Sequence, residues 1–69
     1  MKKKGIDQLI GKYCKIVARD PGEERVHVIF GYVTDIDHDA GFLVIESNEG
    51  VGCLSIKTIE AIKPTNNRM

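Results

Sequence analysis

The chain has 69 residues, and its 10 acidic and 10 basic side chains give a formal net charge of zero at pH 7. A chain this short forms one small domain with a marginal core, which association, disulfides or metal ions commonly reinforce. The zero net charge excludes a global attraction to nucleic acid or anionic lipid. No run approaches the roughly 18 apolar residues of a membrane-spanning helix.

The first part of the chain is basic and polar. Residues 1–5 are expected to form a flexible basic arm, and residues 6–10 one helical turn with Asp7 as N-cap and Gly11 as stop. The arm resembles the charged start of a signal peptide, but no apolar run long enough for export follows it. We therefore expect a soluble cytoplasmic protein without a membrane partner.

Two strands are predicted next, because apolar and polar residues alternate between turn residues. The first, residues 13–19, places every second side chain from Cys14 to Ala18 on one face. The second, residues 25–36, is long and has Gly31 at its centre. A glycine inside a strand commonly marks a bulge or a bend, so this strand is expected to bend there.

Shorter strands follow at residues 42–46 and 51–56, and residues 58–62 form a last strand or 3₁₀ turn that Pro64 closes. Residues 65–69 are a polar tail. Strands at intervals of 8–12 residues indicate a single all-β barrel domain.

The long strand is apolar on both faces, which is unusual for a half-buried strand. Phe30 and Tyr32 fall on one face and Ile29 and Val33 on the other, and residues 42–45 repeat this arrangement. The core of so small a chain covers only one face. The other face requires a strongly curled barrel or a second copy, so we expect a homo-oligomer.

A short motif pattern runs through these strands. Gly31 is followed six residues later by Asp37, with apolar residues 43–45 beyond, and Ile59 and Ile62 form a closing apolar pair. This pattern resembles the Sm/LSm family of small RNA-associated barrels that form rings. The resemblance gives these four residues structural roles.

The resemblance implies a five-stranded, strongly bent SH3-like barrel over residues 6–64, preceded by a short N-terminal helix. It also implies a homo-oligomeric ring that joins neighbours through the edges of the fourth and fifth strands. The family's RNA-binding asparagine is replaced by Gly41, and its Ile-Arg-Gly segment corresponds to residues 56–58, with Lys57 in place of the arginine.

A role as a binding module for single-stranded RNA is the leading hypothesis. The candidate RNA-binding residues are Lys57, Asp39, Gly41, Lys15 and Tyr13. The lysines would contact phosphates, and the tyrosine would stack on a base.

A second small-barrel family, the PRC-barrel, has a similar Gly-x-Val-x-Asp segment, here residues 31–35. That resemblance implies a structural or protein-interaction barrel with no nucleic-acid role. The two alternatives remain open at this point.

Four acidic residues have the spacing of calcium ligands, with the first at Asp35 and the others at Asp37, Asp39 and Glu46. Position 6 of such a loop requires glycine and is Ala40 here, and the flanking segments are strands rather than helices. A solvated hairpin is the simpler interpretation of these acids.

Little in the sequence indicates catalysis. His27 lies in an apolar strand and is expected to be packed or at an interface, whereas His38 lies in an acidic turn and is expected to be exposed. Cys14 and Cys53 could form a disulfide, but buried free thiols are the simpler interpretation. We expect no enzymatic activity, no cofactor and no small-molecule substrate.

Overall fold

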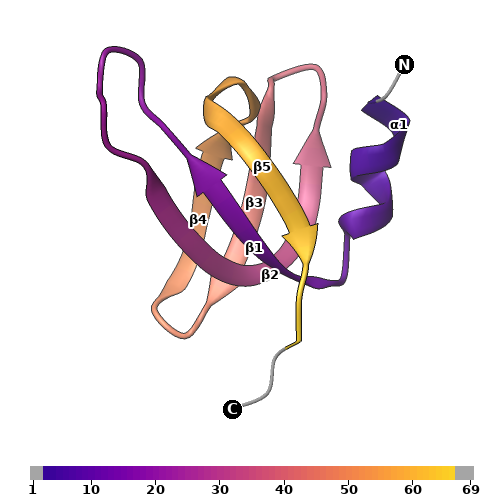
Figure 1. Ribbon diagram of the computed structural model, residues 1–69. Coiled ribbons are helices and arrows are strands. Elements are labelled where there is room, and N and C mark those ends of the chain that lie inside the picture. The colour runs from indigo at the N-terminus through magenta and orange to yellow at the C-terminus, as the bar shows by residue number, and fades with distance from the viewer. Residues whose placement is uncertain (1–2, 67–69) are drawn as a thin grey trace.

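The computed structural model describes residues 3–66, which form a five-stranded antiparallel sheet (Figure 1). A short helix, α1 (Lys3–Ile6), continues as a 3₁₀ turn, η1 (Asp7–Leu9). The strands are β1 (Tyr13–Ala18), β2 (His27–Asp37), β3 (Phe42–Ser47), β4 (Gly50–Ser55) and β5 (Ile59–Pro64); η2 (Ile56–Thr58), a second 3₁₀ turn, joins β4 to β5. All five strands were predicted, with ends correct to within two residues.

The strand order is β4-β3-β2-β1-β5, so β4 and β5 are the two edges of an open sheet. The predicted all-β fold is therefore confirmed. Of the two alternatives predicted for residues 58–62, the strand is correct for residues 59–62, since β5 runs from Ile59 to Pro64 and only Thr58 belongs to the turn η2.

The core lies on the concave side of the curved sheet. On β1 every second residue is buried, as the alternation predicted. The fully or nearly fully buried side chains are Cys14, Ile16, Ala18, Val33, Leu43 and Ile45. Ile59 and Ile62 are half-buried and pack against this cluster.

Strand β2 bends strongly and divides its length between two partners (Figure 1). Residues 27–31 pair with β1 alone, Tyr32 pairs with both neighbours, and residues 33–37 pair with β3 alone. Gly31 lies at the change of partner. A Cβ atom there would approach the Glu46 carbonyl oxygen to 2.8 Å, so only glycine allows β3 to come this close.

One hydrogen bond shows to which side of β2 each backbone N–H and C=O group points. The Val33 N–H donates to the Lys12 carbonyl at 3.1 Å, which lies on the β1 side. Because these directions alternate along a strand, the backbone N–H and C=O of Ile29 and Gly31 also point toward β1, whereas those of Val28 and Phe30 point away from it. On the side that points away from β1, no strand among residues 3–66 pairs with residues 27–31 of β2.

The N-terminal segment covers the second half of β2, on the same side on which β1 pairs with the first half. Ile10 forms a bridge with Val33, and the Gly11 N–H donates to the Val33 carbonyl at 2.6 Å. Leu9 packs against the core, and His38 contacts the carboxylate of Asp7 at 2.7 Å. The short helical segment was predicted, but it begins earlier than expected.

The predicted N-cap at Asp7 is wrong. Asp7 is the first residue of η1, Ile6 occupies the cap position, and no described side chain caps this turn. The Asp7 carboxylate pairs with His38 instead. Residues 3–5, predicted as part of a flexible arm, belong to α1, and residues 1–2 lie outside the described part of the chain.

Candidate binding surfaces

The turn between β2 and β3 and the turn η2 lie together at one end of the sheet. The Ile56 N–H donates to the Gly41 carbonyl at 2.9 Å, which fixes this contact. Gly41 has a φ of 82°, a backbone conformation that favours glycine. Asp37 holds the turn, because its carboxylate accepts a hydrogen bond from the Ala40 N–H at 3.0 Å.

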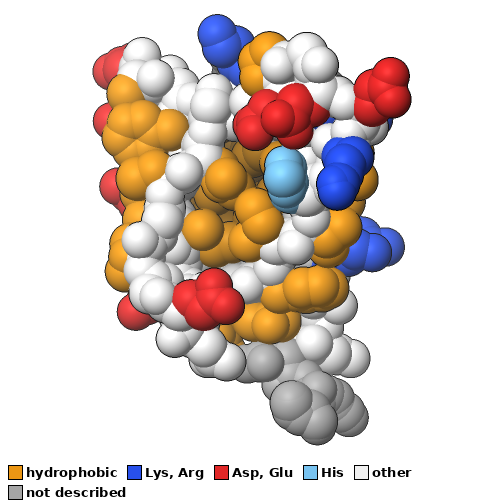
Figure 2. Space-filling view, turned by 90° about the vertical axis from the view of Figure 1, so that its left-hand side faces the viewer, with side chains coloured by type: hydrophobic (Ala, Val, Ile, Leu, Met, Phe, Trp, Pro, Cys, Tyr) orange, Lys and Arg blue, Asp and Glu red, His pale blue; other side chains and the backbone are white. Residues whose placement is uncertain are grey.

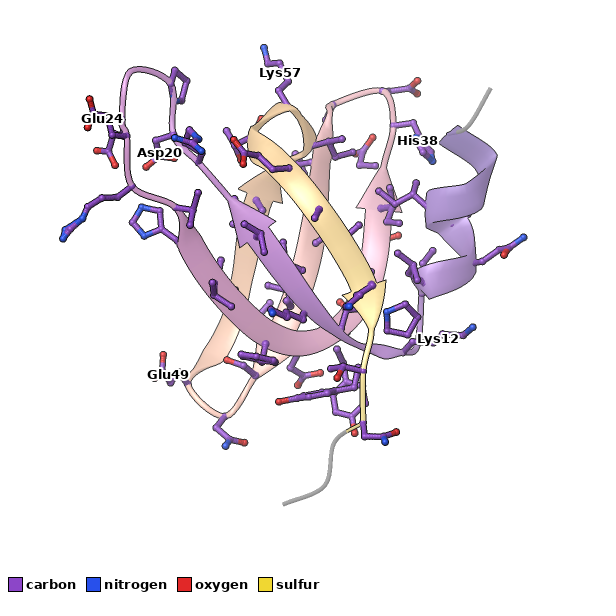
Figure 3. The ribbon with its side chains drawn as sticks, in the orientation of Figure 1. Lys12, Asp20, Glu24, His38, Glu49 and Lys57 are labelled. Atoms are coloured by element: carbon purple, nitrogen blue, oxygen red, sulfur yellow. The ribbon has the colours of Figure 1, made fainter. Side chains whose placement is uncertain are left out.

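The predicted RNA-binding residues separate into two groups. Lys57, Asp39 and Gly41 lie at the end formed by these turns, where Lys57 projects away from the sheet (Figure 3). Tyr13 begins β1, whose other end meets the residues after η2. Five steps of strand place Tyr13 about 17 Å from that end. The structure therefore does not bring the five residues into one site.

Lys15 lies on the outer face of β1, beside an aromatic cluster. It is opposite Phe30 on β2 and Lys63 on β5. The Tyr13 ring stacks near Phe30 with centroids 6.5 Å apart and meets Tyr32 edge-on at 5.1 Å. The sequence showed these apolar residues on one face, but only the strand register identifies them as neighbours.

This aromatic cluster borders a groove of about 680 Å³. Val28 and Phe30 on its β2 wall are 50% and 46% exposed, values that are high for large apolar side chains. The opposite wall is formed by the end of β3, with Glu46, and by the turn between β3 and β4, with Glu49. Figure 2 shows apolar side chains in the hollow, with acidic side chains near its upper and lower borders.

The four acids with calcium-like spacing do not form a ligand group in the described residues. The Asp35 carboxylate accepts a hydrogen bond from the Ile36 N–H at 2.9 Å, and Asp37 is engaged in the turn. Asp35 lies opposite Val44, whereas Glu46 lies opposite Tyr32, farther along the hairpin.

The loop between β1 and β2 contains a different mixed cluster. His27 Nε2 lies 3.9 Å from an Asp20 carboxylate oxygen and 3.8 Å from a Glu23 carboxylate oxygen. All three side chains are more than half exposed. His27 is thus a solvent-facing neighbour of acids, and its expected packing among apolar residues is wrong.

Arg19 fixes this loop to β5. Its guanidinium donates to the Glu60 carboxylate at 2.6 Å and to the Glu24 carbonyl at 2.8 Å. The hydrogen bond to Glu60, together with its negative charge, raises the pKa of Arg19. This contact holds the β1–β2 hairpin in place beside the groove.

The two cysteines differ in environment. Both are free thiols, as predicted, but Cys14 is fully buried and Cys53 is exposed on β4. The prediction is therefore correct for Cys14 and wrong for the burial of Cys53. Burial raises the pKa of the Cys14 thiol, and the positive charge of Lys12 partly opposes this shift.

No helix within residues 3–66 has the length and apolar character needed to cross a bilayer. In comparisons with known proteins, no family model matches the chain. No curated protein and no solved structure matches it either.

Proposed function

We propose that this protein is a small Sm-like binding module that assembles with copies of itself through the edges of its sheet. The strand order, the strongly bent β2 and the short N-terminal helical segment are the features that an SH3-like barrel of Sm type implies. The single observation that carries the proposal is the pair of free edges, β4 and β5, at opposite ends of the strand order.

Edge β4 lacks the usual protection against pairing. None of its residues Gly50–Ser55 is charged or proline, and Val51 is 70% exposed. Charged side chains and prolines are the common means of preventing edge-to-edge association. An edge without them favours pairing with another strand, and β5 of a neighbouring copy is the partner that the resemblance implies.

The register identifies the backbone groups that would form this contact. The backbone N–H and C=O of Tyr32 point toward β3, so those of its partner Glu46 point toward β2. Those of the preceding residue, Ile45, therefore point toward β4. Ile45 pairs with Gly52, and the flanking residue Val51 therefore directs its N–H to the free edge. A contact between two different edges is head-to-tail, and it closes into a ring when the rotation permits.

Light scattering of the purified protein at tens of micromolar tests assembly, for which we expect the mass of several subunits. Val51→Pro removes an edge N–H while preserving the bonds to β3, so it should lower the mass. Val51→Thr keeps that N–H and is the matched control. A monomeric mass for the unaltered protein would contradict the proposal.

RNA binding is the second candidate, favoured by the contact between Gly41 and Ile56. This contact places Lys57, in η2, beside the β2–β3 turn. The family resemblance assigns these two turns to RNA binding. Asp39 in that turn opposes a phosphate, and the net charge of zero gives no general attraction. Any binding should therefore be weak and sensitive to salt.

Titration of labelled oligouridylate by fluorescence anisotropy tests this candidate. Binding through lysines should weaken with salt, with a slope near −0.7 per phosphate neutralised. Lys57→Ala should reduce binding more than Lys63→Ala, since Lys63 lies on β5 away from the two turns. A loss only on removing residues 2–4 would indicate nonspecific attraction. No binding at low salt would leave a structural or protein-interaction barrel without a nucleic-acid role.

A further inference from the structure

The uncovered side of β2 faces the groove described above. We propose that this groove binds an extended peptide, apolar at its centre and basic at its ends, as an additional β-strand. This function uses surfaces other than the β4 and β5 edges, so it stands apart from self-assembly.

The groove presents backbone hydrogen-bonding groups. The N–H and C=O of Val28 and of Phe30 point away from β1, and no strand among residues 3–66 pairs with them. Two residues of extended strand separate them, about 7 Å, which is the repeat at which an antiparallel partner offers its own groups. Peptides that extend a sheet obtain their affinity from such main-chain bonds.

The side chains along this edge favour an apolar peptide centre. Val28 and Phe30 are about half exposed on the outer face, and Tyr13 stacks beside Phe30. Ile29 projects to the opposite face and also lines the groove. An added strand with alternating side chains would place one set against Val28 and Phe30, where cross-strand apolar pairs are favourable.

The charges around the groove favour basic peptide ends. Glu46 and Glu49 belong to the lining, and none of the lining residues is basic. Asp20 lies near the other end of this part of β2, beside His27, as Figure 3 shows. Complementary charge steers binding and suppresses wrong partners. The same acids would repel the phosphates of a nucleic acid, so the proposed occupant is a peptide.

A direct test uses a fluorescein-labelled synthetic peptide, Arg-Val-Thr-Val-Arg, blocked at both ends. Anisotropy titration should show saturable binding, and a peptide with glutamates in place of both arginines should bind more weakly. Val28→Pro removes a groove N–H without affecting the bonds to β1, and it should weaken binding about tenfold. Val28→Thr retains the N–H and should change binding by less than about threefold.

The acidic wall provides a second pair of variants. Glu46→Gln and Glu49→Gln should each weaken binding about two- to fivefold at low salt, with a smaller effect at high salt. Glu24→Gln is the matched control, because Glu24 is exposed but does not line the groove. Equal effects at all three positions would contradict the proposed docking site.

Amide hydrogen exchange measured by NMR identifies the contact. In the free protein, the amides of Ile29 and Gly31 should exchange slowly, and those of Val28 and Phe30 rapidly. The peptide should slow only the latter pair. Absence of binding, protection confined to β4, or displacement of the peptide by oligouridylate would each overturn the proposal. Protection of Val28 that rises with protein concentration alone would also overturn it, since a second copy would then occupy the groove.

Discussion

The two halves of β2 resemble each other in pairing and differ in what covers them. Each half has one strand partner, β1 for residues 27–31 and β3 for residues 33–37, so each has one side that no strand of residues 3–66 covers. Beside the second half, the N-terminal segment supplies the Ile10 bridge and the Gly11 hydrogen bond to Val33. Beside the first half there is the groove.

This difference separates two uses of an incomplete sheet. Apolar side chains of the second half, such as Val33, are buried and help to define the fold. Those of the first half, such as Val28 and Phe30, remain about half exposed, although exposure of large apolar groups is unfavourable. An unfavourable surface that the fold does not require is a reasonable place to look for a partner.

The largest expected effect comes from the junction of the two halves. A valine at position 31 would place Cβ 2.8 Å from both the Glu46 carbonyl oxygen and the Ile45 side chain. We expect Gly31→Val to destabilise the fold by about 1–3 kcal/mol, since the strands must separate. Thermal unfolding followed by circular dichroism measures this change.

Gly52→Val is the matched control, because a Cβ there meets no atom of the described part of the chain within 4 Å. It should change stability by less than about 0.5 kcal/mol. If both variants unfolded at the temperature of the unaltered protein, the close approach of β2 and β3 at Gly31 would not matter for stability.

A smaller effect should follow from weakening the cover of the second half. Leu9 packs half-buried against the core, so we expect Leu9→Ala to cost about 1–2 kcal/mol, less than a fully buried leucine. Amide exchange should accelerate in residues 33–37 and remain unchanged in residues 27–31. The exposed Gln8→Ala is the control, and equal acceleration in both halves would show that the N-terminal segment does not protect one half selectively.

The smallest effect concerns Cys14, which pairs with Gly31 at the junction. Burial raises the pKa of this thiol, so its contribution to stability is complete below the unfolded pKa of about 8.5 and is lost as pH rises. Urea unfolding between pH 7 and pH 10 should show a loss of at most about 1.4 kcal/mol per pH unit from this group.

The variant Cys14→Ala should lack this contribution, whereas Cys53→Ala should retain it because Cys53 is exposed. An identical pH dependence in the unaltered protein and in Cys14→Ala would show that the buried thiol does not affect stability in this range.

Much of the fold could be predicted because local signals agree with the final structure. Alternation defined the buried face of β1, and Pro64 marked the end of β5. The Asp7 cap failed because the helix begins at Lys3, so Asp7 no longer precedes the first turn. His38, 31 residues away, is its partner, and a local pattern contains no information on such a distant contact.

The candidate binding surfaces were less predictable for a related reason. Tyr13 and Lys57 belonged to one predicted RNA-binding set, yet they lie near opposite ends of β1. Conversely, the residues of the groove come from three strands and one turn, and only the register brings Phe30 near Glu49. The one usable signal was the excess of apolar residues on β2, and it indicated a contact without indicating its partner.

The irregularity after Val33 has a consequence for changes in chain length. Val33 pairs with Ile45 and Asp35 with Val44, so Thr34 is an extra residue in β2. Thr34 and Asp35 are both exposed, and the half-buried Ile36 returns to the core side. Loss of one residue from a regular strand would exchange its two faces beyond that point. At Thr34 alone, β2 could lose one residue and still present every later side chain to its present face.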